Sequence, residues 1–218
     1  MISQESFHAA YDAEPVEMVI AGRSYRIFTP RTIERFLHDA GTLNGFPLWA
    51  RIWPASLVLA ELVASTPADR RRQWIEIGGG LGQVSIVAAA CGHRITFSEA
   101  NPHALAFARA SAELNGLPQL PVVPLDWGER SAPGPFDVVI GSEVVYRDAD
   151  IAPLQRLFAR LLKPGGEVIL AGEVRRVSDG FLRRMEESFH VQVHRKRLCA
   201  GPHAVTDLVF RLQPKSQN

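Results

Sequence analysis

The stretch that decides the fold runs from Trp74 to Gly82 and reads WIEIGGGLG. An apolar run ends in an acidic residue and passes into four glycines within five positions, and the following segment, 83–91, reads as a helix. A strand, a glycine turn and a helix in this order present bare backbone N–H groups and a helix N-terminus to a ligand. Glycines are needed because a Cβ would collide where a ligand touches the backbone. The stretch therefore predicts a ligand-binding turn.

The spacing of the glycines distinguishes between the ligands that such turns bind. A phosphate-binding P-loop ends in Gly-Lys-Ser/Thr, and no lysine lies near this turn. A dinucleotide fingerprint needs a third glycine at a spacing that this chain lacks. The pattern present is Glu-x-Gly-x-Gly-x-Gly, formed by Glu76, Gly78, Gly80 and Gly82. It resembles motif I of the class I S-adenosylmethionine-dependent methyltransferases, with a glycine turn that binds no ligand as the alternative.

The composition narrows the class of protein. A length of 218 residues with 46% hydrophobic residues suits one compact domain, and no apolar run is long enough to span a bilayer. The net charge of +1 gives the molecule no long-range attraction to nucleic acid. Two cysteines, Cys91 and Cys199, support neither a disulfide framework nor a zinc site. We therefore expect a cytoplasmic protein with no bound metal, no nucleic-acid partner and no membrane partner.

Strand and helix patterns alternate after the glycine turn, which predicts an α/β fold. The expected architecture is a doubly wound, mostly parallel seven-stranded sheet with helices on both faces and a C-terminal antiparallel hairpin. We divide the chain into an N-terminal extension with a small β-hairpin, residues 1–45, and a Rossmann-like domain, residues 46–218, packed as one unit. The expected strands are 73–77, 93–98, 119–125, 136–141, 167–172, 190–198 and 205–212, and the expected helices are 54–63, 83–91, 102–115, 150–162 and 178–189.

Candidate ligand-binding residues follow the second and third of these strands, because the crevice of such a sheet lies beyond the carboxyl ends of its strands. Glu99, followed by Ala100, ends the second strand at the spacing of an acid that binds ribose hydroxyls. Asp126 and Trp127 follow the third strand. In the methyltransferase layout this turn closes over the adenine, which the flat indole can cover. The alternatives are a charge at a helix N-terminus for Glu99 and a core residue for Trp127.

The fourth strand runs into Ser142 and Glu143, with Tyr146 three positions later. Together with Trp53-Pro54 and Asp126-Trp127, the Glu-x-x-Tyr spacing resembles the seven-strand protein-lysine methyltransferases, also called methyltransferase family 16. The segment before Pro54 is similar to the members that modify the β-subunit of electron-transfer flavoprotein. The resemblance covers about residues 16–212. One departure is Asn101, where the family more often has a second carboxylate.

The resemblance implies a cofactor, a reaction and an acceptor. S-adenosyl-L-methionine donates the methyl group, S-adenosyl-L-homocysteine is the product, and a lysine ε-amine of a protein accepts. Glu143 is expected to capture the ammonium and Tyr146 to line its channel, and these two are the expected catalytic residues. Three alternatives stay open: a small-molecule N- or O-methyltransferase, a nucleic-acid methyltransferase, and a non-enzymatic binding protein. The residues expected to bind the cofactor are Trp53, Glu76, Gly78, Gly80, Gly82, Glu99, Ala100, Asp126, Trp127 and Ser142.

Overall fold

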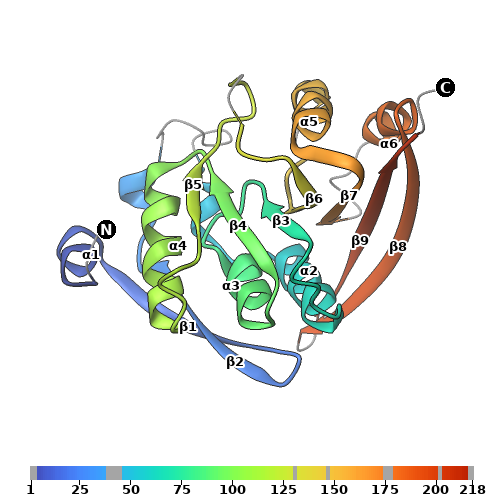
Figure 1. Ribbon diagram of the computed structural model, residues 1–218. Coiled ribbons are helices and arrows are strands. Elements are labelled where there is room, and N and C mark those ends of the chain that lie inside the picture. The colour runs from blue at the N-terminus through green and yellow to red at the C-terminus, as the bar shows by residue number, and fades with distance from the viewer. Residues whose placement is uncertain are drawn as a thin grey trace.

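A seven-stranded sheet forms the centre of the molecule (Figure 1). Its spatial order is β5-β4-β3-β6-β7-β9-β8; the first five of these are parallel, and β9 runs antiparallel to both of its neighbours. The strand order reverses at β3, so the ligand crevice is expected beyond the carboxyl end of that strand. The strands are β3 (Gln73–Glu76), β4 (Arg94–Glu99), β5 (Val122–Pro124), β6 (Phe136–Ser142), β7 (Leu162–Glu173), β8 (Phe189–Ala200) and β9 (His203–Pro214). The computed structural model describes residues 4–37, 46–129, 132–145, 148–173, 179–200 and 203–215.

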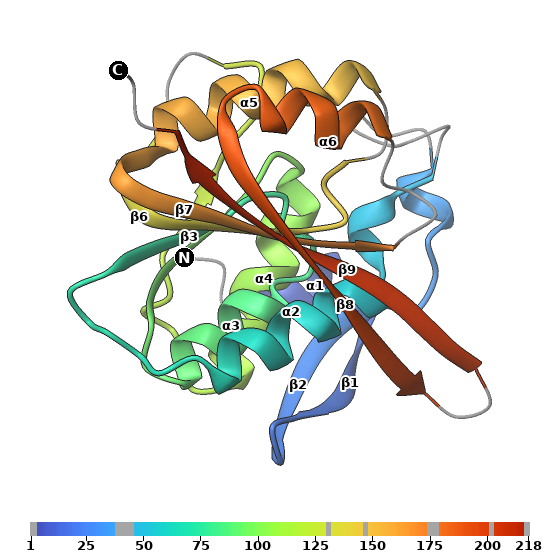
Figure 2. The same ribbon diagram turned by 90° about the vertical axis from the view of Figure 1, so that its right-hand side faces the viewer.

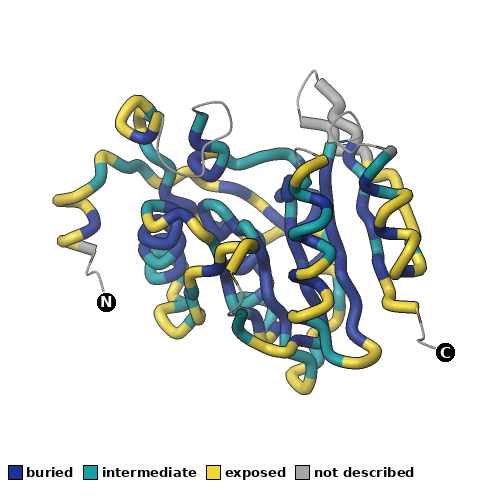
Figure 3. Tube along the Cα trace, turned by 90° about the horizontal axis from the view of Figure 1, so that it is seen from above, coloured by how far each residue is buried: buried dark blue, intermediate teal, exposed yellow. Residues whose placement is uncertain are grey.

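Helices cover both faces of the sheet, with α2, α3 and α4 on one side and α5 and α6 on the other (Figure 2). Successive side chains of a strand point to opposite faces, so Trp74 joins the hydrophobic cluster under the first group of helices and Ile75 joins the cluster under the second. The central strands are buried between the two layers, while the outer sides of the helices are exposed (Figure 3). The helices are α2 (Pro54–Ser65), α3 (Gln83–Ala90), α4 (Pro102–Leu114), α5 (Asp148–Leu161) and α6 (Asp179–Glu186).

The N-terminal part of the chain packs on α4. A short helix, α1 (Gln4–Ala10), precedes a hairpin of β1 (Ala13–Ile20) and β2 (Arg23–Pro30). The Phe28 N–H donates to the Ser111 hydroxyl of α4 over 2.9 Å. The buried ring of Phe7 stacks edge-on against Phe107 of α4 at 5.0 Å between centroids. These contacts continue the hydrophobic cluster of α2, α3 and α4 into the hairpin. The boundary at residue 45 stays a prediction, and it borders residues 38–45, which lie outside the described part of the chain.

The observed architecture confirms the fold predicted from the sequence, with local differences. The strand expected at 167–172 begins earlier, as β7 starts at Leu162, and the helix expected at 178–189 ends at Glu186. The third strand of the prediction, 119–125, shrinks to Val122–Pro124. This strand lies at the edge of the sheet, where prolines such as Pro121 and Pro124 lack the N–H that a longer ladder needs. The helix α1 was not predicted. In the described ranges, none of the helices combines the length and apolarity that a membrane span requires.

Candidate active site

The glycine turn between β3 and α3 has a backbone that only glycine adopts without strain. Gly78, Gly80 and Gly82 have φ values of +57°, +56° and +88°. A Cβ on Gly80 would lie 3.2 Å from the Trp49 carbonyl oxygen, and one on Gly78 would lie 3.3 Å from the indole of Trp127. The three glycines of the motif therefore let neighbouring segments of the chain approach the turn closely, while contact of a ligand with this backbone stays a prediction.

Gly79, an unrestricted position of the motif, also has to be glycine. A Cβ built there would overlap the buried ring of Phe97. Its N–H donates to the Ser98 carbonyl of β4 over 3.1 Å, and its carbonyl accepts from the Gly82 N–H over 3.0 Å. The motif does not predict this residue, because it leaves the position open. Only the packing of β4 under the turn reveals the requirement.

Glu76 lies behind the glycine turn, fully buried. Its Oε2 accepts from the backbone N–H and the hydroxyl of Ser85, at 2.9 Å and 2.5 Å, so the carboxylate joins the end of β3 to the first turn of α3. Its other oxygen, Oε1, is buried without a hydrogen-bond partner. Burial raises the pKa of Glu76 to about 8, against the lowering effect of the bonds from Ser85.

Glu99, the last residue of β4, forms a hydrogen bond with the glycine turn. Its Oε2 accepts from the Gly80 N–H over 3.1 Å, and its Oε1 accepts from the N–H groups of Ala100 and Asn101, at 2.7 Å and 3.1 Å. Burial raises its pKa, and the three N–H donors oppose that rise. Asn101 caps α4 by accepting two N–H bonds of its first turn, at 2.8 Å and 3.2 Å. This residue thus performs the capping role that a carboxylate would also perform at this position.

Trp127 forms one wall beside the turn. Its half-buried ring and the side chain of Val144 lie at the same distance, 3.3 Å, from the place of a Cβ on Gly78. Its carbonyl accepts from the Arg160 guanidinium over 3.3 Å. Asp126 is exposed, and its Oδ1 accepts from the Gly128 N–H over 2.8 Å. The indole therefore faces the glycine turn, while the neighbouring carboxylate stabilises a tight turn at the rim.

Glu143 directly follows β6 and has a strained conformation. Its φ of +50° lies in the left-handed region, which costs a residue with a Cβ about 1–2 kcal/mol. Its N–H donates to the Ala171 carbonyl over 2.8 Å, and its Oε1 accepts from the Glu173 N–H over 2.9 Å, so β7 holds the residue at both ends. Only 6% of Glu143 is exposed. Strain of this kind persists where the surrounding structure enforces it, often at functional sites.

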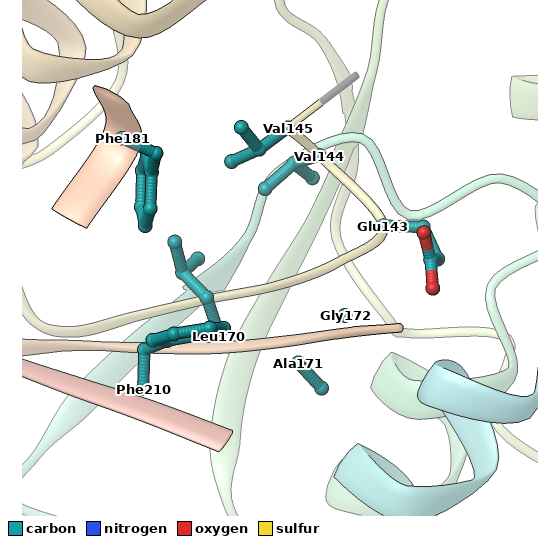
Figure 4. A pocket seen from close by; sticks show the side chains of 8 residues that line it. All are labelled: Glu143, Val144, Val145, Leu170, Ala171, Gly172, Phe181 and Phe210. Atoms are coloured by element: carbon teal, nitrogen blue, oxygen red, sulfur yellow. The ribbon is translucent and has the colours of Figure 1, made fainter. Parts of the chain in front are cut away.

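A small cavity of about 10 Å³ lies beside Glu143. The rings of Phe181 and Phe210 and the side chain of Leu170 gather at its apolar end, and the Glu143 carboxylate points away from them (Figure 4). Ser142 is partly exposed and pairs with Ala171 in the β6–β7 ladder. Tyr146, the other predicted catalytic residue, lies outside the described residues.

Trp53 is the N-cap residue of α2, at the other side of the turn. Its indole N–H donates to the Leu48 carbonyl over 2.8 Å, and its own carbonyl accepts from the Ser56 hydroxyl over 2.7 Å. These bonds close the loop that carries Trp49, whose carbonyl oxygen lies over Gly80. Trp53 therefore supports the segment that covers the glycine turn.

A larger cleft of about 410 Å³ lies at the opposite, amino-terminal ends of the strands. It is lined by residues such as Trp74, His93 and Arg94 and by the segment 116–121. All of the predicted site residues that are described lie instead at or beside the carboxyl ends of β3, β4, β5 and β6. Within the described ranges, no group of three or more His, Cys, Asp or Glu residues is arranged to hold a metal ion.

The strand order with an antiparallel β9, the glycine turn after β3 and the acid at the end of β4 define a class of protein: the S-adenosylmethionine-dependent methyltransferases of the class I fold. Residues 44–188 match the model of a family described as lysine methyltransferase. The chain belongs to this lysine methyltransferase family. Its fold is shared by solved structures that hold AdoMet or SAH.

Known proteins with similar sequences support the assignment of the chain to this family. EEF1A lysine methyltransferase 3 of Mus musculus is 31% identical over 199 residues, which are 84% of this chain and 85% of the relative. The histone-arginine methyltransferase METTL23 of Mus musculus is 34% identical over 109 residues, covering 45% of this chain but only 42% of the relative. The fold resembles that of the T. thermophilus 16S rRNA methyltransferase RsmC, solved with AdoMet and guanosine. That likeness has a TM-score of 0.64 at 19% identity, and it covers 93% of this chain and 51% of RsmC.

The residues at the turn fit the cofactor. S-adenosylmethionine combines a nucleoside with a cationic amino acid, so it needs a hydrogen-bond acceptor for ribose, a flat surface for adenine and an acceptor for its amino group. Glu99 supplies a partly exposed carboxylate next to the Gly80 N–H. Trp127 supplies a half-buried indole at Gly78. The unpartnered Oε1 of Glu76 is an acceptor with spare capacity behind the turn.

Proposed function

We propose that this chain transfers a methyl group from S-adenosylmethionine to the ε-amine of a lysine in a protein. The observation that carries the proposal is the position of Glu143. This carboxylate is held against β7 by two hydrogen bonds, at the end of the strand that neighbours the glycine turn. The family of the chain and its 31% identity to EEF1A lysine methyltransferase 3 support a protein lysine as the acceptor.

We assign the cofactor contacts to residues around the glycine turn. Gly78, Gly80 and Gly82 let the cofactor approach the backbone, and Glu99 accepts hydrogen bonds from its ribose. Trp127 covers the adenine. The other predicted contact residues act at the edges of the same site: Trp53, Glu76, Ala100, Asp126 and Ser142.

The role of Glu143 follows from the acid–base chemistry of lysine. When bound, the cofactor supplies a methyl group on a positively charged sulfur, which passes to the nitrogen lone pair as the carbon–sulfur bond breaks. A lysine with a pKa of about 10.4 is neutral in roughly one molecule in a thousand near pH ~7.4, a deficit of about 4 kcal/mol. A carboxylate alone cannot remove that deficit because it favours the ammonium. Glu143 therefore captures and orients the ammonium, and it accepts the proton or passes it to water once desolvation has lowered the amine pKa.

Labelled methyl transfer tests the proposal. The protein is incubated with radiolabelled S-adenosylmethionine and a cell lysate, and the labelled protein is hydrolysed to its amino acids. Label in methyllysine is the expected result. Label in methylarginine would favour arginine methylation, the chemistry named for METTL23. Label found only in small molecules would show that the acceptor is a small molecule and not a protein.

A substitution at Glu143 separates transfer from cofactor binding. Glu143→Gln keeps the shape of the side chain but removes its charge, so we expect S-adenosylhomocysteine to bind with unchanged affinity while methyl transfer to protein falls by about a hundredfold or more. Calorimetry and initial rates at saturating cofactor measure the two effects. Full activity in the Glu143→Gln protein would make this carboxylate an ordinary structural acid and remove the main support for lysine as the acceptor.

We also propose that the protein acts in the cytoplasm. The support is its low cysteine content, with Cys91 as a free thiol. Cell fractionation followed by detection of the native protein tests this location, and recovery from an oxidising compartment would contradict it.

A further inference from the structure

Asp207 differs from the other buried acids in the described part of the chain. Glu76 accepts from Ser85, Glu167 pairs with arginines, and Glu143 accepts from a backbone N–H. Asp207 is fully buried, yet neither of its carboxylate oxygens has a hydrogen-bond partner. A buried carboxylate without a partner destabilises the folded state. Its presence therefore calls for an explanation other than stability.

Asp207 lies at the end of the sheet where the reaction takes place. It stands directly opposite Glu173 in the antiparallel ladder of β9 and β7, so both side chains lie on the same face of the sheet. The Glu173 N–H in turn donates to the Glu143 carboxylate over 2.9 Å. Three neighbouring strands, β6, β7 and β9, thus bring three carboxyl groups to the same end of the sheet.

The described residues provide no positive charge that neutralises Asp207. Lys196 is its direct partner in the β8–β9 ladder, but the lysine side chain is exposed and forms no hydrogen bond with Asp207. Burial raises the pKa of Asp207, and the negative charge of Glu173 raises it further. Both effects disfavour the charged form of Asp207 in the free protein, and a cation placed beside the two carboxyl groups would offset the repulsion between them.

We infer that Asp207, together with Glu173, binds the positively charged end of the methyl acceptor and forms the side of the acceptor site opposite Glu143. The inference rests on the proposed function for the identity of the acceptor, a primary ammonium. An ammonium carries three N–H donors, and carboxyl groups on three adjacent strands can accept them from different directions. The acceptor thereby leaves bulk water, which strengthens each of these bonds.

The test is the binding of n-butylammonium, which mimics a lysine side chain, to the protein loaded with S-adenosylhomocysteine. NMR titration compares the wild type with Asp207→Asn, with n-pentanol as the neutral probe. We expect Asp207→Asn to weaken butylammonium binding about tenfold or more, because a hydrogen bond to a charged group is lost. Binding of pentanol and of the cofactor product should not change. The control variant is Asp69→Asn, a partly exposed acid paired with Arg71 at the other end of the sheet, and it should leave butylammonium binding unchanged.

Thermal unfolding of the free protein supplies a second readout. If Asp207 serves binding, Asp207→Asn should be at least as stable as the wild type, since it removes a buried unpaired charge. Lower stability or failure to fold would assign Asp207 a structural role and overturn the inference. Equal butylammonium affinity in the two proteins, or no saturable binding by the wild type, would overturn it as well.

This binding test does not depend on methyl transfer. A wild-type protein that binds butylammonium through Asp207 but labels no lysine would keep the inference and remove the proposed acceptor. Lysine labelling together with an unchanged butylammonium affinity in Asp207→Asn would keep lysine as the acceptor and overturn the inference about Asp207.

Discussion

Substituting Gly80 by alanine separates the backbone requirement of the glycine turn from its role in binding. Gly80 has a φ of +56°, and a Cβ there would lie 3.2 Å from the Trp49 carbonyl oxygen. The left-handed conformation costs alanine about 1–2 kcal/mol. Crowding against a backbone atom that cannot rotate away adds about 1–3 kcal/mol. We therefore expect Gly80→Ala to lower the free energy of unfolding by roughly 2–5 kcal/mol in total.

The chain contains a matched control for the conformational part of this loss. Gly116 follows α4 with a φ of +73°, and a Cβ there would meet no atom within 4 Å. Gly116→Ala should therefore cost only about 1–2 kcal/mol and leave the cofactor site intact. For a chain of this size each kcal/mol lowers the unfolding midpoint by about 2–4 °C, which thermal denaturation resolves.

Cofactor affinity provides the decisive comparison between the two variants. The Gly80 N–H donates to Glu99 over 3.1 Å, so displacing this turn also displaces the predicted ribose-binding carboxylate. Loss of one hydrogen bond to a charged group corresponds to about a tenfold or larger loss of affinity. Calorimetry with S-adenosylhomocysteine should show this loss in Gly80→Ala and none in Gly116→Ala. If both variants bind as tightly as the wild type, the glycine turn does not hold the cofactor and the reasoning is refuted.

Two further predictions concern the walls of the same site. Trp127→Ala should weaken S-adenosylhomocysteine binding by about 1–3 kcal/mol, the range for a base stacked on an aromatic ring, as measured by calorimetry. A folded Trp127→Ala protein that is less stable but binds normally would instead make Trp127 a core residue. Burial raises the pKa of Glu76 from 4.5 to about 8, so its contribution to stability is complete below pH 4.5 and is lost as the pH rises to 8. Denaturant unfolding across this range should show the wild type losing stability relative to Glu76→Gln, and parallel pH profiles would contradict the assignment.

The parts of the fold that follow from local patterns were predictable from the sequence. The Glu76–Gly82 motif fixed the turn, and alternating strand and helix patterns gave the order of the elements. The sequence does not predict the helix α1, because a helix of seven residues has little stability of its own. This helix depends on the contact of Phe7 with α4. The short strand β5 depends on its place at the edge of the sheet, which sequence patterns do not reveal.

The residues of the candidate site were predictable where they belong to a sequence motif. Glu99 and Trp127 lie beside the glycine turn because each follows a strand whose carboxyl end meets the same edge. Gly79 and Asp207 belong to no motif. A ring of β4 requires glycine at the first position, and only the pairing of β9 with β7 places the second opposite Glu173. The positive φ of Glu143 is likewise set by the bonds of that residue to β7 and not by its own preference.

The left-handed backbone at Glu143 has a consequence for protein engineering. A glycine there would adopt φ of +50° without strain, but it would also leave the Glu173 N–H without its carboxylate acceptor, so relief of strain and loss of a buried hydrogen bond act in opposite directions on heat resistance. Where relief of strain is the larger effect, a library screened for heat resistance alone would enrich variants without the carboxylate to which we assign capture of the ammonium. Conversely, positions where substitution improves folding while ending turnover would mark the residues that selection has retained for catalysis at the expense of robustness.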